Sequence, residues 1–266
     1  MASGYPLPGS IIQQICRRCL ASDRLWLALL CSLALTVPAG AAPATESAAH
    51  ALLPYTAQYR TSARGFDLEV TRELRLSDSG DGSYVLTSGG SLLVAGFHEV
   101  SVFRVEEDRI QPVSYTYRGT GLVSRHLELR FPPAAGAIKS LYKDRWYELP
   151  NDGNTLDRIN QLEQLRLSLL ADAAPTDDLD MRVADGKRIK ASQLVFVGEE
   201  TLPTPLGPVH TLHFERLHDA SDRRSDIWLA PAWDYLMVKT VHVEDGRPLT
   251  MELTDAILAG QPLAVR

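Results

Sequence analysis

Cysteine is almost absent from this sequence, and positive charge is scarce. The three cysteines, Cys16, Cys19 and Cys31, all lie near the N-terminus of a 266-residue chain. Disulfides and thiolate metal sites are therefore excluded from the remainder of the chain.

The 27 basic residues are outnumbered by 33 acidic ones, which gives a formal net charge of −6. An acidic surface repels phosphate backbones, so we expect no nucleic-acid partner.

The familiar motifs of catalysis and cofactor binding are also missing. The sequence contains no G-x-S-x-G nucleophile elbow, no H-E-x-x-H zinc motif, no Walker loop and no Rossmann glycine fingerprint. We therefore predict no catalytic residues, no metal ligands and no cofactor, and we expect a protein that is not an enzyme.

The first 41 residues have the pattern of a secretory signal peptide. Three arginines precede the apolar run Leu25–Val37, and the small residues at 39–41 supply an A-x-A cleavage site. The apolar run is too short to span a bilayer as a helix. We expect cleavage before Ala42, a periplasmic location, and no integral membrane span in the mature protein. Retention of the segment as an uncleaved anchor is the alternative.

The rest of the chain reads as one β-rich domain. The predicted layout is a signal peptide at 1–41, a flexible linker at 42–54, the domain at 55–258 and a C-terminal tail at 259–266. In "FDLEVTRELRL" apolar and polar residues alternate, and Arg72 is the single polar residue on the apolar face. This alternation is typical of antiparallel strands with one face exposed to solvent.

Short turn signals separate these strand patterns. Asp185-Gly186 and Asp245-Gly246 each lie between two strand-like runs, which predicts two tight hairpins. The spacing of the turn signals predicts about ten to twelve strands in all.

One segment has helical rather than strand periodicity. Residues 154–172, "NTLDRINQLEQLRLSLLAD", contain no glycine or proline, and Asn154 or Thr155 is the expected N-cap. The leucines and Ile159 cover about 200° of the helix surface at about 100° per residue. An arc this wide predicts a helix cradled on several sides. The fold class is therefore mainly β with one main α-helix, in which a curved antiparallel sheet, or an open or closed β-barrel-like domain, wraps the helix.

Three histidines lie close together in "GPVHTLHFERLH". Three β-branched or aromatic residues and the preceding Gly207-Pro208 favour a strand here. In a strand, His210 and His213 point to opposite faces and cannot share one ion. His218 lies beyond the strand, in a turn. We therefore predict no metal site at these histidines.

The C-terminal half resembles a known family. The matching elements are Asp185-Gly186-Lys187, Thr204-Pro205-Leu206-Gly207, Ile227-Trp228-Leu229-Ala230-Pro231 and Glu252-Leu253. They are similar to the uncharacterised bacterial family named domain of unknown function 3108. In that family an Asp followed by a Ser opens the helix. Asp157 matches, and Asn160 stands at the expected position of the Ser. The resemblance implies an exported, envelope-facing, β-rich protein with no established activity, so it transfers no catalytic residues.

A wide apolar helix inside a sheet with one apolar face produces either a packed core or a cavity. We therefore expect a non-catalytic periplasmic protein that binds a lipid or other apolar small molecule. The candidate ligand contacts are Trp228, Trp233 and Tyr235 around a Pro-Ala turn, and Ile159, Leu162, Leu165 and Leu169 on the helix. Two alternatives remain open at this point: a structural or assembly factor that binds another envelope protein through a sheet edge, and an envelope hydrolase.

Overall fold

The computed structural model describes residues 51–264, apart from 64–65, 93–94, 122–123, 134–135, 173–177, 219–222 and 245. The predicted signal peptide and residues 42–50 of the predicted linker lie outside the described residues. Among the residues that are described, no helix has both the length and the apolar character needed to cross a membrane.

The N-terminal part of the described chain forms β1 (Tyr55–Ala63), β2 (Phe66–Leu76), β3 (Tyr84–Leu92), β4 (Ala95–Glu106), β5 (Arg109–Thr120), β6 (Arg125–Arg130), β7 (Ile138–Tyr142), β8 (Arg145–Leu149) and β9 (Thr155–Leu156). The remainder forms α1 (Asn160–Ala171), β10 (Leu179–Asp185), β11 (Arg188–Thr204), β12 (Gly207–Leu217), β13 (Arg223–Ala230), η1 (Pro231–Trp233), β14 (Leu236–Glu244), β15 (Arg247–Leu258) and β16 (Gln261–Pro262).

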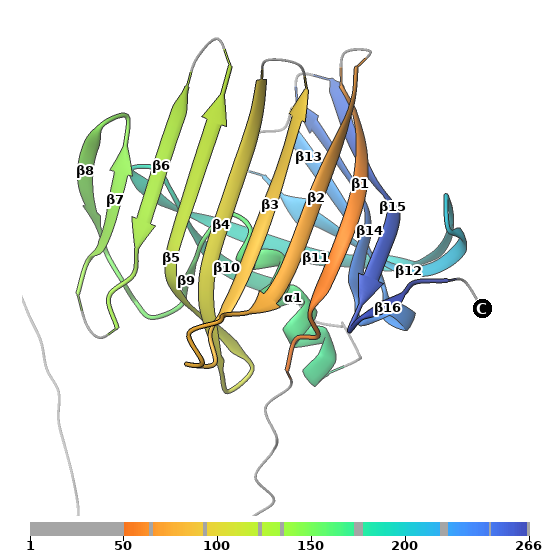
Figure 1. Cartoon of the computed structure of the whole chain (residues 1–266), viewed down its shortest axis with the longest axis horizontal. Helices are drawn as coiled ribbons and strands as arrows, with labels where there is room; N and C mark the ends of the chain where they lie inside the picture. The colour runs from red at the N-terminus through yellow and green to blue at the C-terminus, as the bar shows by residue number, and fades with distance from the viewer. Residues whose placement is uncertain are drawn as a thin grey trace, which may run out of the picture. The chain divides into compact units, whose positions relative to one another are not determined.

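All the strands belong to one sheet of 16 strands (Figure 1). The order is β8-β7-β6-β5-β4-β3-β2-β1-β15-β14-β13-β12-β11-β10-β9, and β16 pairs with β15. Neighbours are antiparallel except β9 and β10, which run parallel. Because β1 pairs with β15, the first and last long strands meet in the middle of the sheet. The two ends of the sheet are β8 and β9.

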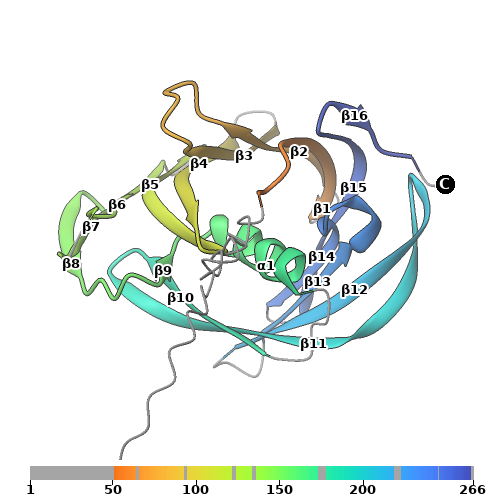
Figure 2. The same cartoon turned by 90° about the horizontal axis from the view of Figure 1, so that it is seen from below.

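The sheet curves around the helix, as the sequence predicts. Figure 2 shows α1 inside the curve, with β11 and β12 on one side and β3 and β4 on the other. Register shifts in four ladders, for example at Val102/Phe103 and Phe196/Gly198, bend the strands locally. The fold class is therefore confirmed: mainly β, one helix, and a large curved, open, mostly antiparallel sheet.

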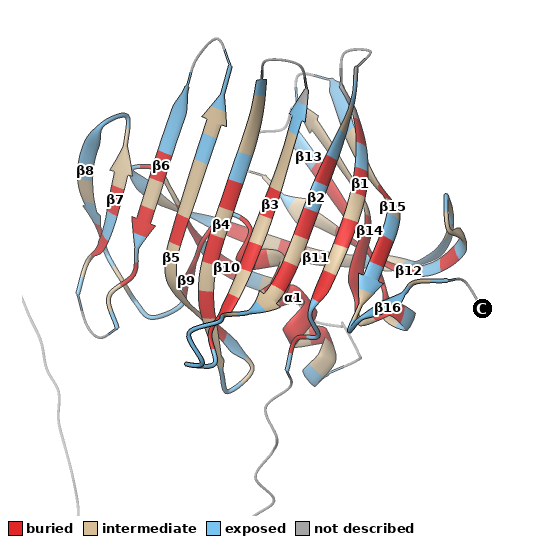
Figure 3. Cartoon of the chain, in the orientation of Figure 1, coloured by how far each residue is buried: buried red, intermediate tan, exposed pale blue. Residues whose placement is uncertain are grey.

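The core lies between α1 and the concave face of the sheet. Buried residues alternate with exposed or intermediate ones along most of the long strands (Figure 3). Fully or almost fully buried apolar side chains come from both halves of the sheet and from the helix, and include Tyr59, Leu86, Phe103, Leu129, Leu167, Leu194 and Leu229. The inward face of each strand thus supplies the wall against which the helix packs.

The two Asp-Gly hairpins form as predicted. β10 and β11 are joined at Asp185↔Arg188, with Gly186 at a φ of 62°, and β14 and β15 are joined at Glu244↔Arg247. The predicted count of about ten to twelve strands was too low. Several of the strands, above all the two-residue β9 and β16, are too short to show an alternating pattern.

The helix begins later than the sequence predicts. Residues Thr155–Leu156 form β9 instead of a first helical turn, and α1 starts at Asn160. The expected caps Asn154 and Thr155 therefore lie before the helix. Ile159 stands at the N-cap position without a side-chain cap, and the carboxylate of Asp157 accepts the backbone N–H groups of Ile159 and Asn160.

At both ends, residues outside the predicted domain bounds of 55–258 also pack against the domain. Leu52, in the predicted linker, is only 1% exposed. In the predicted tail, β16 pairs with β15, and Leu263 packs against the core. The Ala259 N–H also donates to the Pro54 carbonyl at 2.8 Å, so the two ends of the described chain lie side by side.

Candidate functional site

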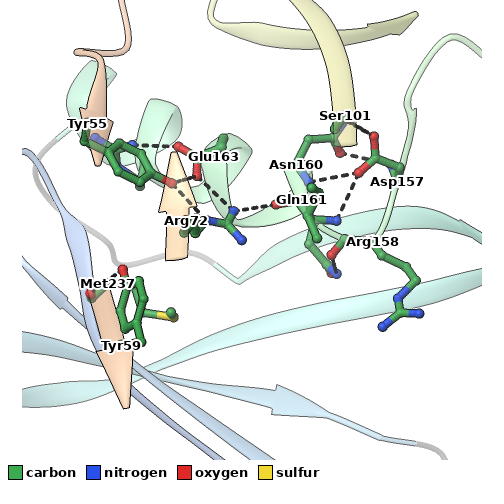
Figure 4. Close-up of polar contacts among 12 residues, drawn as sticks. Tyr55, Tyr59, Arg72, Ser101, Asp157, Arg158, Asn160, Gln161, Glu163 and Met237 are labelled. Carbon is green, nitrogen blue, oxygen red and sulfur yellow. Dashed lines mark hydrogen bonds and ion pairs between the residues drawn. The ribbon is translucent and has the colours of Figure 1, made fainter. Parts of the chain in front are cut away.

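A buried ion network ties the helix to the sheet. Glu163 of α1 has no exposed surface, and its carboxylate accepts hydrogen bonds from Arg72 Nη2 at 3.0 Å and from Arg166 Nη1 at 2.6 Å. The Tyr55 hydroxyl donates to the same carboxylate at 2.8 Å, and Arg72 Nε donates to that hydroxyl at 2.8 Å. Figure 4 shows Tyr55, Arg72 and Glu163 converging from β1, β2 and α1.

The second carboxylate of this network is Asp234, in the turn between η1 and β14. Arg166 Nη2 donates to Asp234 Oδ2 at 3.0 Å, and Arg166 Nε donates to the Asp234 carbonyl at 3.1 Å. Asp234 and Tyr235 have φ values of 56° and 55°, a left-handed conformation that non-glycine residues seldom adopt. Arg166 therefore anchors a strained turn to the helix. The positive charges of Arg72 and Arg166 are balanced by the carboxylates of Glu163 and Asp234.

The Glu163 carboxylate stays ionised at neutral pH. Burial by itself would raise the pKa of the Glu163 carboxyl, but the guanidiniums of Arg166 and Arg72 outweigh burial and hold this pKa below its ordinary value. Burial also raises the pKa of the Tyr55 hydroxyl far above its ordinary value, so Tyr55 remains a hydrogen-bond donor. We conclude that this network positions the helix.

A second buried polar cluster lies at the N-terminal end of α1. Asp157 Oδ1 accepts the backbone N–H groups of Ile159 and Asn160, each at 3.0 Å. Asn160 Oδ1 accepts the backbone N–H of Asp157 at 2.9 Å, which completes a reciprocal pair of the capping-box kind. Ser101 of β4 donates to Asp157 Oδ2 at 2.6 Å. Figure 4 shows this cluster beside the ion network.

One carboxyl of this cluster titrates near neutral pH. Burial raises the pKa of Asp157 to about 6, against the lowering effect of its hydrogen bonds from Ser101 and the backbone. Nearby, Glu99 of β4 accepts a hydrogen bond from the Tyr115 hydroxyl at 2.5 Å, and its carboxylate lies 3.8 Å from the Arg158 guanidinium.

A cleft of about 900 Å³ opens beside the helix; we name it the helix cleft. It lies between α1, the β4–β5 turn and strands β10 and β11. Its apolar lining comes from Ile110, Leu156, Leu179 and Met181. The helix contributes Gln164, Ser168 and Ala171. This volume lies within the range of small-molecule sites, which typically combine an apolar lining with a few polar groups.

A second cleft of about 930 Å³ has a different lining; we name it the basic cleft. It lies among the β5–β6, β7–β8 and β10–β11 turns. Four of its lining side chains are basic: Arg118, Arg125, Lys143 and Arg158. Asp144 and Asp185 offset part of that charge. This cleft suits a polar or anionic group better than an apolar one.

A serine on β13 is held between two imidazoles. Ser225 Oγ lies 2.8 Å from His218 Nε2 and 2.7 Å from His242 Nδ1. Arg216 is the ladder partner of Ser225 on β12, and His242 is its partner on β14. Directly paired residues project from the same face of a sheet. We name these four residues the Ser225 cluster.

The seven predicted ligand contacts are mostly core residues. Ile159, Leu165, Leu169, Trp233 and Tyr235 are buried in the apolar cluster, and Leu162 is partly buried against it. Trp228 is also buried, and its ring stacks on His213 with centroids 4.4 Å apart. None of the seven lines either of the two clefts named above. Their role as ligand contacts stays a prediction.

The histidines are arranged as strand geometry requires. His213 is partly buried, and its Nε2 lies 2.8 Å from Asp226 Oδ1, whereas His210 is exposed beside Glu199. Within the described ranges, no group of three or more His, Cys, Asp or Glu side chains is placed to hold a metal ion. His218 lies with Ser225 and His242 instead.

Sequence reasoning missed the ion network and the Ser225 cluster. One signal for the network was visible, because Arg72 is the single polar residue on the apolar face of its strand. A lone arginine at such a position predicts a buried carboxylate partner. Its partner Glu163 lies 91 residues away in the chain, so spacing could not identify it.

These features define a β-barrel-like protein in which one helix fills part of an open sheet. A family model described as "Protein of unknown function (DUF3108)" matches residues 54–254, and the chain belongs to this family. Among solved structures, it is similar to a "Beta-barrel-like Protein of Domain of Unknown Function DUF1849 from Brucella abortus", with a TM-score of 0.50 and 11% identity over 78% of this chain and 98% of that one. No curated protein matches the sequence. The likeness to the solved structure concerns the fold alone.

The first prediction concerns the ion network. Glu163→Gln leaves Arg72 and Arg166 buried without their shared carboxylate. We expect it to lower the free energy of unfolding by about 3 to 5 kcal/mol, since an uncompensated buried charge is costly. Urea unfolding followed by circular dichroism measures the change. The matched control is Glu252→Gln, which breaks the partly exposed pair with Lys239 and should change stability little. Equal effects of the two variants would contradict the role given to Glu163.

The second prediction concerns pH. Because the folded pKa of Asp157 is about 6 and its ordinary value is 3.8, the folded state holds this proton more tightly than the unfolded chain does. The resulting stability is fully present below about pH 4 and is lost as the pH rises through about 6. Relative to Asp157→Asn, which does not titrate, the wild type should lose about 1 to 3 kcal/mol between pH 4 and pH 8. A difference between the two proteins that does not vary with pH would refute this assignment.

Proposed function

We propose that this protein is exported to the periplasm and binds an apolar or amphipathic small molecule in the helix cleft. The observation that carries the proposal is the cleft of about 900 Å³ with Ile110, Leu156, Leu179 and Met181 in its lining. Of these, Leu179 is partly exposed, whereas Ile110, Leu156 and Met181 are buried and form the floor of the cleft. Apolar surface that a ligand covers in a concave site favours binding by about 25 cal/mol per Å².

The architecture explains why a cleft forms at this place. Among the described strands, the sheet does not close on itself, and its two ends, β8 and β9, are not paired with each other. The helix fills the concave face with its buried leucines, whereas Gln164, Ser168 and Ala171 face the cleft. A ligand chain in the cleft would cover Leu179, which is partly exposed, and Ala171, which is exposed.

We further propose that the protein is not an enzyme. The ion network and the Asp157 cluster are fully used in holding the helix, and neither contributes a carboxylate or guanidinium to the helix cleft. The acidic and basic residues that do line this cleft, such as Asp180 and Arg182, are exposed residues of β10. A carrier or storage protein needs only an apolar lining and a rim of solvent-exposed polar residues such as these.

A structural or assembly factor is the second candidate, and the sheet edge favours it. In the part of the chain that the structure describes, β8 pairs with β7 alone, and its Trp146 is 50% exposed. An edge strand with free backbone groups can accept a strand from another protein. The Arg130 guanidinium lies 5.0 Å from the Trp146 ring centre, so part of this surface is already covered within the chain.

Export is tested on the N-terminus. We expect the intact mass of the protein isolated from its native host's envelope to correspond to a chain that begins near Ala42, because the small residues at 39–41 form a cleavage site. Full-length protein in the cytoplasm would contradict export. Full-length protein in the membrane fraction would instead indicate that the segment is retained as an anchor.

Ligand binding is tested with a neutral long-chain probe, dodecan-1-ol, by isothermal titration calorimetry. Ala171→Trp places a large ring at the end of α1, in the lining of the cleft, and should weaken binding by at least about tenfold through lost space. The control is Ala95→Trp, an exposed position outside the lining, which should bind like the wild type. Wild-type protein that neither binds dodecan-1-ol nor carries a co-purifying apolar ligand would contradict the proposal and leave the assembly factor ahead.

A further inference from the structure

The basic cleft contains cations without the carboxylate partners that many other basic side chains have. Arg72, Arg182 and Arg223, for example, each lie against a carboxylate. Within the described ranges, Arg125 and Lys143 of the basic cleft have no carboxylate at ion-pair distance. Acidic residues outnumber basic ones in this chain, so composition does not explain why unpaired cations gather in one concave site.

The strand pairing directs Arg125 to the concave side of the sheet. Tyr117 of β5 pairs with Leu127 of β6, which pairs with Tyr142 of β7. Side chains in such a row project from one face, and Arg125 lies two residues before Leu127 on the same strand. Leu127 is buried in the core. Arg125 therefore projects from the face that packs on the core, at the exposed mouth of the basic cleft.

Two tyrosine rings of this row hold the other two cations. Lys143 Nζ lies 5.4 Å from the centre of the Tyr142 ring, and the guanidinium carbon of Arg158 lies 5.3 Å from the centre of the Tyr117 ring. The face of an aromatic ring attracts a cation. Figure 4 shows the Arg158 side chain extending away from Asp157. Cations from three separate segments of the chain thus line one cleft.

Two glycines leave room for these rings. A Cβ atom at Gly119 would lie 2.9 Å from the Tyr117 hydroxyl oxygen, and one at Gly186 would lie 3.1 Å from the Tyr142 ring. Gly119 is the ladder partner of Arg125. The Tyr117 hydroxyl therefore lies over the strand pair that carries Arg125, where it can donate a hydrogen bond to the same ligand.

The carboxylates near the cleft leave an excess of positive charge. Asp185 already forms an ion pair with Lys190, and Glu99 lies 3.8 Å from the Arg158 guanidinium. Asp144 is the other acidic residue of the lining. A concave site with excess charge of one sign raises the local concentration of ions of the opposite sign.

The arrangement suits a phosphate group better than a carboxylate. A single guanidinium binds a planar carboxylate through two parallel hydrogen bonds. A phosphate monoester carries about −1.5 to −2 charges and three acceptor oxygens, so it can use donors that come from several directions. The volume of about 930 Å³ exceeds that of one phosphate group and leaves room for the rest of a small molecule.

We propose that the basic cleft binds a small phosphate monoester, whose phosphate group contacts Arg125, Lys143 and Arg158 and accepts a hydrogen bond from the Tyr117 hydroxyl. The basic cleft and the helix cleft share no lining residue. This inference is therefore independent of the proposed function.

The test uses titration calorimetry with glycerol 3-phosphate, and compares it with glycerol and with succinate, a dianion of similar size. The wild type should bind glycerol 3-phosphate at least about tenfold more tightly than either. Arg125→Gln and Lys143→Gln should each weaken this binding by at least about tenfold, since each removes a charge-assisted hydrogen bond. Both side chains are exposed, so the melting temperature should not change. Arg247→Gln, at an exposed position outside the lining, is the matched control and should bind like the wild type.

Several results would overturn the inference. A wild type that does not bind glycerol 3-phosphate, or that binds succinate as tightly, would contradict the phosphate assignment. Equal weakening by Arg247→Gln would show a general effect of net charge. Inorganic phosphate that binds as tightly as the ester would overturn the monoester assignment. Binding to vesicles of phosphatidylglycerol without binding of the soluble ester would show that the cations contact a membrane surface instead.

The hydroxyl of Tyr117 is tested separately. Tyr117→Phe keeps the ring beside Arg158 and removes only the hydroxyl, so it should weaken glycerol 3-phosphate binding by about threefold or more. An unchanged affinity would contradict the role given to this hydroxyl. None of these variants should change the binding of dodecan-1-ol, because the two clefts are separate.

Discussion

The shared carboxylate of Glu163 is the interaction on which the rest of this fold depends. A sheet that does not close has no ladder of hydrogen bonds to join its ends, so its curvature must be held from inside. Glu163 connects α1 to β2 through Arg72 and, through Arg166, to the turn that precedes β14. One helix thereby contacts both halves of the sheet, which are far apart in the sequence but joined at β1 and β15. Buried ion pairs seldom add net stability, yet they fix one arrangement where apolar contacts alone would allow several.

Fixing the helix in this way has a consequence for binding. The apolar face of α1 packs in the core. Its polar and small residues Gln164, Ser168 and Ala171 line the helix cleft. The lining of the cleft shares no residue with the ion network, so the charges that hold the helix are separate from the candidate binding surface.

The architecture could be predicted from the sequence because it rests on local periodicity. Alternation along 66–76 and the Asp-Gly turns identify antiparallel strands and hairpins, and the apolar arc of 154–172 identifies a helix surrounded by the sheet. The start of the helix could not be predicted, because β9 is a two-residue strand whose partner β10 is more than twenty residues away. The ion network and the Ser225 cluster depend on which strands become neighbours, and that order is not encoded in the spacing of any one segment. Arg72, on an otherwise apolar face, was the exception: its position indicated a buried partner without identifying it.

A crystal structure of the protein with dodecan-1-ol tests the central claim most directly, that an apolar chain binds in the helix cleft. The account predicts the alkyl chain beside α1, against Leu179 and Ala171. An alkyl chain bound elsewhere, with the helix cleft empty, would contradict it.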